Sequence, residues 1–152
     1  MRTLLVLTAV LNLATPATAA EPGGAALATL NGFRDVACGS TPKTGMRLSD
    51  GPQDLGKTYV RATDDLTLGD GGTLASLEYS YLGGKFTFVM AQTTGISATN
   101  AASTALLAAF GPPTLIDGTN MTWTGTHVSV GLAVMPASSG RAMLSWTCMG
   151  VR

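Results

Sequence analysis

The chain has 152 residues, enough for one domain, and its 9 basic and 9 acidic residues give a formal charge of zero. Charged residues make up 12% and hydrophobic residues 45% of the sequence, a composition that argues against intrinsic disorder. The sequence also lacks the basic surplus of a nucleic-acid binder and the polybasic segment that attracts a protein to an anionic membrane.

The first residues have the three parts of a secretory signal peptide. Arg2 supplies a positive charge, residues 4–13 form an apolar run, and Ala17-Thr18-Ala19 fits the small-x-small cleavage rule. The run is about half the length that a membrane-spanning helix needs. We therefore predict cleavage before Ala20, or alternatively before Glu21. The mature chain is then periplasmic or secreted by a bacterium, with no membrane span.

Residues 20–31 read as a flexible lead-in that ends in one helical turn, and residues 32–152 as a single domain. Residues 32–39 and 57–63 are predicted strands, separated by a turn-rich segment with several glycines and prolines. Two aspartate-rich turns follow within residues 64–73.

A hairpin over residues 74–93 is the clearest local prediction. Leu77, Tyr79 and Tyr81 alternate with polar residues, as in a half-buried antiparallel strand. Gly83-Gly84 permits the positive φ angles of a tight type I′ turn.

One helix and several strands complete the chain. Ser97 is the predicted N-cap of the helix, Gly111 follows its last turn, and Pro112-Pro113 prevent its continuation. Strands are predicted at 114–116, 120–124, 127–134 and 142–149. This order predicts an α+β fold in which one main helix packs on an antiparallel sheet.

Cys38 and Cys148 are the only cysteines, and both lie in phase with apolar neighbours on predicted strands. An even count in an oxidising compartment indicates a disulfide. Two buried free thiols are the alternative. With one distant histidine, the two cysteines do not form a four-ligand zinc pattern.

His127 is the only histidine, so any histidine-based hydrolase must use it. A triad would combine it with Ser129 or Ser145 and with Asp117, but the chain contains no G-x-S-x-G nucleophile elbow. The simpler interpretation is a histidine on the solvated side of a strand.

Two sets of residues suggest metal binding. Asp64, Asp65 and Asp70 are oxygen ligands in turns, where calcium would bind. The thioethers of Met90, Met121 and Met143 would suit copper(I). Turn hydrogen bonds and core packing explain these residues as well, and we predict no metal and no cofactor.

Aromatic residues give the candidate contact sites. Core packing is the default for Trp123 and Trp146, whereas a solvent-facing tryptophan would mark a partner site. The candidate partner-binding residues are Trp123, His127, Tyr79 and Tyr81.

Several short motifs resemble small exported bacterial α+β modules. They are Gly32-Phe33-Arg34, Cys38-Gly39, the Tyr79…Gly83-Gly84…Phe86 hairpin, Phe110-Gly111-Pro112-Pro113 and Met121-Thr122-Trp123. Their order over residues 32–149 is similar to that of modules of the β-lactamase-inhibitor-protein and outer-membrane-assembly-lipoprotein type. The chain has neither the lipid-anchoring cysteine of the second type nor the tandem repeat of the first, so no functional residue is carried over.

A sheet scaffold without a reactive constellation predicts a non-enzymatic binding module of the cell envelope, whose partner is another envelope or extracellular protein. The alternatives are a small hydrolase that uses His127 and a metal-handling protein.

Overall fold

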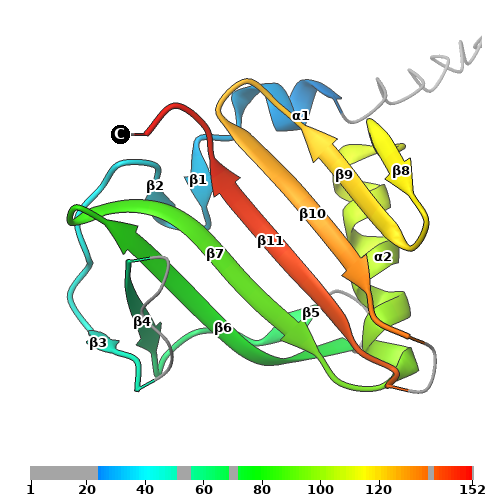
Figure 1. The fold of residues 1–152 in the computed structure, drawn as a ribbon, viewed down its shortest axis with the longest axis horizontal. Coiled ribbons are helices and arrows are strands. Elements are labelled where there is room, and N and C mark those ends of the chain that lie inside the picture. Colours follow the sequence, from blue (N-terminus) through cyan, green and yellow to red (C-terminus); the bar gives the residue numbers. More distant parts are fainter. Residues whose placement is uncertain (1–23, 51–55, 69–71, 137–138, 152) are drawn as a thin grey trace, which may run out of the picture.

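The computed structural model describes residues 24–50, 56–68, 72–136 and 139–151 (Figure 1). The predicted signal peptide, residues 1–19, and the first part of the lead-in lie outside these ranges. Within them, no helix is long and apolar enough to cross a membrane.

The described chain is built around one large antiparallel sheet (Figure 1). Its strands, in spatial order, are β3 (Met46–Leu48), β4 (Lys57–Arg61), β6 (Gly72–Leu82), β7 (Lys85–Thr93), β11 (Ala142–Cys148), β10 (Val128–Val134), β9 (Asn120–Thr124) and β8 (Leu115–Asp117). β5 (Thr67–Leu68) also pairs with β6, and β1 (Gly32–Phe33) and β2 (Val36–Ala37) form a separate small sheet. The predicted α+β class, with an antiparallel sheet and one main helix, is confirmed.

The β6–β7 hairpin forms where the sequence predicts it. Gly83 and Gly84 both have positive φ angles, of 58° and 80°, which residues with a side chain rarely adopt. The long strands that follow from this turn form the centre of the sheet together with β11 and β10.

Helix α2 (Ile96–Phe110) matches the predicted helix except at its start. Gly95, not Ser97, stands at the N-cap, and no side chain caps this end. Gly95 has a φ of 88° and its carbonyl accepts a hydrogen bond from the Thr99 N–H, so the helix begins two residues early. At the other end, Gly111 follows the last residue with a φ of 71°, as predicted.

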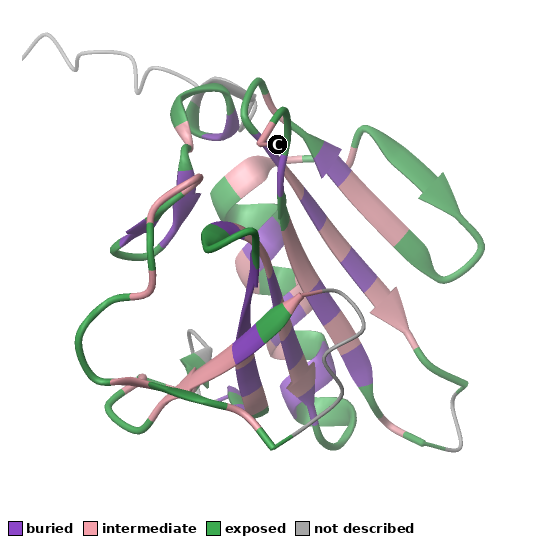
Figure 2. Cartoon of the chain, turned by 60° about the vertical axis from the view of Figure 1, so that its left-hand side comes forward, coloured by how far each residue is buried: buried purple, intermediate pink, exposed green. Residues whose placement is uncertain are grey.

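The core lies between α2 and one face of the sheet. Ala102 and Leu106 of the helix belong to the same buried cluster as Val89 and Leu144 of the central strands (Figure 2). Two polar contacts fix the helix ends. Thr93 and Thr99 share a buried 2.8 Å hydrogen bond at the start, and Trp123 Nε1–H donates to the Gly111 carbonyl at 2.8 Å at the end.

The helical turn predicted at the end of the lead-in is present as helix α1 (Gly24–Thr29). Leu27 of this helix is 3% exposed and belongs to the core. The described part of the lead-in therefore packs on the rest of the domain through this apolar side chain.

The predicted disulfide is present between Cys38 and Cys148, whose Cα atoms are 5.6 Å apart. It joins the segment just after β2 to the last residue of β11. The bond therefore connects the first part of the described domain to its last strand.

Candidate interaction surface on the open side of the sheet

The two sides of the sheet differ because α2 covers only one of them. In Figure 1 the helix lies behind the sheet, and no described helix lies in front of it. Side chains alternate accordingly along β10, where Val128, Val130 and Leu132 are buried and Ser129 and Gly131 are half-buried.

Strand register shows which residues share the uncovered side. One row runs across neighbouring strands through Leu115, Thr122, Gly131, Ser145, Met90 and Glu78. The rows beside it contain Ser129, Thr147 and Phe88 on one side and Asn120, Ala133, Met143 and Gln92 on the other. We call the surface formed by these three rows the open face.

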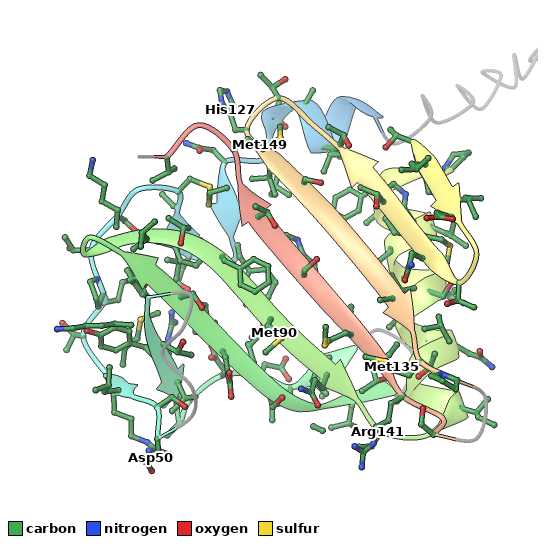
Figure 3. All side chains as sticks on the ribbon, viewed as in Figure 1. Asp50, Met90, His127, Met135, Arg141 and Met149 are labelled. Carbon is green, nitrogen blue, oxygen red and sulfur yellow. A yellow bond between two sulfur atoms is a disulfide. The ribbon has the colours of Figure 1, made fainter. Side chains whose placement is uncertain are left out.

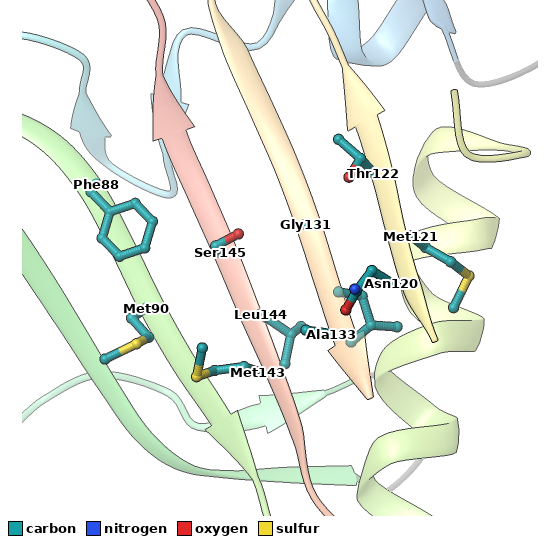
Figure 4. A pocket seen from close by; sticks show the side chains of 11 residues that line it. Phe88, Met90, Asn120, Met121, Thr122, Gly131, Ala133, Met143, Leu144 and Ser145 are labelled. Carbon is teal, nitrogen blue, oxygen red and sulfur yellow. The ribbon is translucent and has the colours of Figure 1, made fainter. Parts of the chain in front are cut away.

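A shallow hollow of about 170 Å³ lies in the middle of the open face (Figure 4). Its floor is low because Gly131, Ala133 and Ser145 are small, whereas Phe88 and the two methionines Met90 and Met143 are bulky. A Cβ atom on Gly131 would lie 2.6 Å from the Ser145 hydroxyl, so the glycine makes room for that hydroxyl. The lining is mostly apolar.

A second hollow of about 300 Å³ adjoins the first, since Met143 lines both. Gln92, Met135 and Arg141 also line it, at the end of the sheet where β10 leads into β11 (Figure 3). The uncovered apolar surface therefore continues from the centre of the open face to the end of the sheet at which Arg141 lies.

The centre of the open face carries no formal charge. Glu78 on β6 and Asp117 on β8 are the acidic side chains at its opposite sides. Removing neutral hydroxyl, amide and thioether groups from water costs less free energy than removing ions. Depletion of charged residues is also typical of the core of a protein–protein interface.

Three of the four predicted partner-binding residues are core residues. Tyr79, Tyr81 and Trp123 are 0%, 1% and 1% exposed, so their rings cannot contact a partner on this surface. Their polar atoms have internal partners: Tyr79 Oη–H donates to Asp64 Oδ1 at 2.9 Å, and Tyr81 Oη–H donates to Met46 Sδ at 3.2 Å. The structure thus assigns these three rings to packing.

His127 is exposed, in the connection that leads into β10 (Figure 3). Its carbonyl accepts a hydrogen bond from the Met149 N–H at 2.8 Å, but its imidazole has no hydrogen bond or ion pair with any described residue. Ser129 and Ser145 lie on the open face, and Asp117 lies on the outermost strand, β8. The structure does not link these groups into the triad that a hydrolase would need.

The two described aspartates considered for calcium binding accept hydrogen bonds from other residues. Asp64 accepts from Tyr79, and Asp65 accepts from the backbone and side chain of Thr67, which lowers the pKa of Asp65. Asp70 lies outside the described residues. Met90, Met121 and Met143 all belong to the lining of the hollow, and Met121 also sits opposite Leu132, whose side chain belongs to the core. Across the described ranges, no three His, Cys, Asp or Glu side chains could together hold a metal ion.

The partner-binding candidates taken from the sequence are chiefly aromatic residues with polar atoms, so they do not include the apolar residues of the open face. The alternation along β7 contains a signal for this surface. Val89 and Ala91 are buried on one side of the strand, and Phe88 and Met90, which lie on the other side, are also apolar. Comparisons with family models, with curated proteins and with solved structures find no match to this chain.

Proposed function

We propose that the protein is a non-enzymatic interaction module of the cell envelope, which binds another envelope or extracellular protein through the open face. One observation carries this proposal: a broad sheet face that no described element covers contains an apolar hollow walled by Phe88, Met90 and Met143.

The size of the hollow favours a protein partner. Sites for drug-sized ligands measure about 300–1,000 Å³. The central hollow of about 170 Å³ accommodates little more than one large side chain, and the adjoining hollow of about 300 Å³ only reaches the lower end of that range. Protein interfaces concentrate binding energy in a few such anchor side chains, surrounded by contacts that exclude water. Methionine walls suit this role because their flexible thioethers adapt to the shape of the anchor.

The disulfide supports a location outside the cytoplasm, because such bonds persist in oxidising compartments. With the predicted signal peptide, it favours a periplasmic or secreted protein. The likeness to small exported α+β modules belongs to the same proposal.

The test places a photo-crosslinking amino acid at Phe88 in the exported protein. We expect a discrete crosslinked protein, and we expect no such product when the probe replaces Ala108 on the exposed side of α2. The crosslinked protein is then purified for affinity measurements. Met143→Glu should weaken its binding at least tenfold, because a carboxylate in the hollow would have to be desolvated.

Ile116→Glu is the matched control for the added charge. Ile116 is 65% exposed on β8 and lies on the helix side of the sheet, opposite Met121. It should leave affinity unchanged. Equal crosslinking from Phe88 and Ala108, or equal loss of affinity in the two glutamate variants, would contradict the proposal.

A further inference from the structure

A third hollow, which shares no lining residue with the two hollows of the open face, lies where two paired strands separate. β4 pairs with β6 from Lys57 to Tyr59 and then leaves it, while β4 stays paired with β3 as far as Arg61. The opening has a volume of about 270 Å³. It is lined by Arg47, Val60, Arg61, Ala62, Asp64, Leu66, Ser76, Leu77 and Glu78.

The Arg61 guanidinium in this lining uses only part of its hydrogen-bonding capacity. Nη1 donates to Asp35 Oδ1 at 3.0 Å, and the planar group lies over the Tyr79 ring at 5.4 Å from its centroid. Nε and Nη2 are buried and have no hydrogen-bond partner among the described residues. In arginine–carboxylate pairs, the edge formed by Nε and Nη2 can donate two parallel hydrogen bonds to one carboxylate.

Asp64 lies next to this edge, and only one of its two carboxylate oxygens has partners within the described ranges. Its side chain is 6% exposed, and Oδ1 accepts a hydrogen bond from Tyr79. The same oxygen forms ion pairs with Arg34 Nη1 at 3.6 Å and with Arg61 Nε at 3.8 Å. Oδ2 is buried and has no partner in the described part of the chain. Buried polar atoms without partners are costly and rare in proteins, so three of them on two residues that line one hollow call for an explanation.

The charges and apolar residues of the lining define the chemistry of a ligand. Two cations, Arg47 and Arg61, are balanced by two anions, Asp64 and Glu78, so a ligand with both charges and no net charge is favoured. The apolar part of the lining consists of Val60, Leu66 and Leu77. Since the volume lies just below that of drug-sized sites, the ligand is small.

We propose that this hollow, the β4–β6 site, binds a free α-amino acid with an apolar side chain. The carboxylate of the ligand accepts hydrogen bonds from Arg61 Nε and Nη2 and replaces the 3.8 Å ion pair between Nε and Asp64 Oδ1. The ammonium group of the ligand compensates Asp64 by donating to its Oδ2. The aliphatic side chain contacts Val60, Leu66 and Leu77. The three polar atoms are closed to solvent, so lining side chains must shift as the ligand enters.

The test titrates the purified, disulfide-bonded protein with L-leucine while backbone amide signals are followed by NMR. We expect saturable shifts at Val60, Leu66 and Leu77, with a dissociation constant near or below about 1 mM. Leucinamide, which lacks the carboxylate, and N-acetyl-leucine, which lacks the ammonium group, should each bind at least tenfold more weakly.

Two variants assign the contacts. Arg61→Lys should remove the preference for leucine over leucinamide, and Asp64→Asn should remove the preference for leucine over N-acetyl-leucine. Asp117→Asn is the matched control, because Asp117 lies on β8 at the opposite edge of the sheet and does not line the hollow. It should keep both preferences.

If Arg61→Lys or Asp64→Asn does not fold, the three ligands still test the proposal on the unaltered protein. Equal binding of all three, no saturable shift up to about 10 mM, or shifts confined to the open face would overturn it. The second result would mean that the hollow holds water only. None of these results depends on crosslinking at Phe88, so the two proposals fail independently.

Discussion

Tyr79 and Tyr81 keep their phenol groups inside the protein, and this sets how the folded state responds to alkali. Burial raises the pKa of Tyr81 to about 12. Burial and the hydrogen bond to Asp64 raise the pKa of Tyr79 further above its ordinary value. In the unfolded chain both phenols lose their protons near pH 10.

We therefore predict that the protein loses stability above about pH 10. Below that pH both states hold both protons, and the contribution of the tyrosines is complete. As the pH rises toward 12, only the unfolded state releases them, so the free energy of unfolding falls by about 1.4 kcal/mol per pH unit for each tyrosine. Urea unfolding between pH 8 and 11.5, with tyrosinate absorbance as a second signal, measures the slope.

Tyr81→Phe should reduce this slope by about half, because a phenylalanine has no proton to lose. Tyrosinate absorbance from Tyr79 and Tyr81 that appears in the native protein near pH 10, without any loss of stability, would contradict the prediction.

These two rings also show where residue-level prediction stops. The alternation in residues 74–82 correctly places Tyr79 and Tyr81 on one side of a strand. It does not show whether that side faces the core or a partner, since a tyrosine has both an apolar ring and a polar atom and suits either place. The answer depends on which side α2 covers, and that contact joins residues far apart in sequence.

At the scale of elements, the position of α1 depends on close contact between its Leu27 and Gly125. A Cβ atom on Gly125 would lie 2.4 Å from the Leu27 carbonyl oxygen and 2.9 Å from its Cγ. We predict that Gly125→Ala displaces α1 and lowers the free energy of unfolding by about 1–3 kcal/mol, the usual cost of overpacking. Urea unfolding measures this change.

A double-mutant cycle with Leu27→Ala identifies the cause. Leu27→Ala removes the anchor of α1, so the two substitutions together should cost less than the sum of their separate effects. Strict additivity would show that Gly125→Ala acts somewhere other than at the contact with α1.

Elements with local signals are predictable here, and their assembly is not. Gly83-Gly84 predicts the β6–β7 hairpin, and Gly111 predicts the end of α2. β7 pairs with β11, which places Met90 beside Ser145. The two segments lie about fifty residues apart, and neither segment contains a local signal for this pairing. The hollow at the centre of the open face depends on register across four strands, and the β4–β6 site depends on the place where β4 leaves β6.

At the scale of the whole molecule, a single long helix meets a sheet that is wider than the helix can cover. The sequence order predicts the α+β class, but only the assembled sheet shows that one side remains open. The composition of that side follows from this arrangement: small, neutral residues over β10 and β11 need no helix above them, whereas the valines and leucines on the other side do.

The disulfide acts on the whole chain, because it closes a segment of 110 residues. Backbone hydrogen bonds already hold both of its ends: the Gly39 N–H donates to the Phe86 carbonyl at 2.9 Å, and the Met149 N–H donates to the His127 carbonyl at 2.8 Å. The folded structure should therefore persist without the bond. Its contribution then arises mainly in the unfolded state, whose conformational entropy the crosslink reduces.

We predict that replacing both cysteines by alanine keeps the native amide NMR spectrum but lowers the free energy of unfolding. For a closed segment of this length, loop-closure entropy sets the loss at about 4–5 kcal/mol, measured by urea unfolding. Protein recovered from outside the cytoplasm should contain no thiol that can be alkylated without a reductant. A loss below about 1 kcal/mol, or two free thiols in the exported protein, would mean that backbone contacts alone fasten the two ends of the domain.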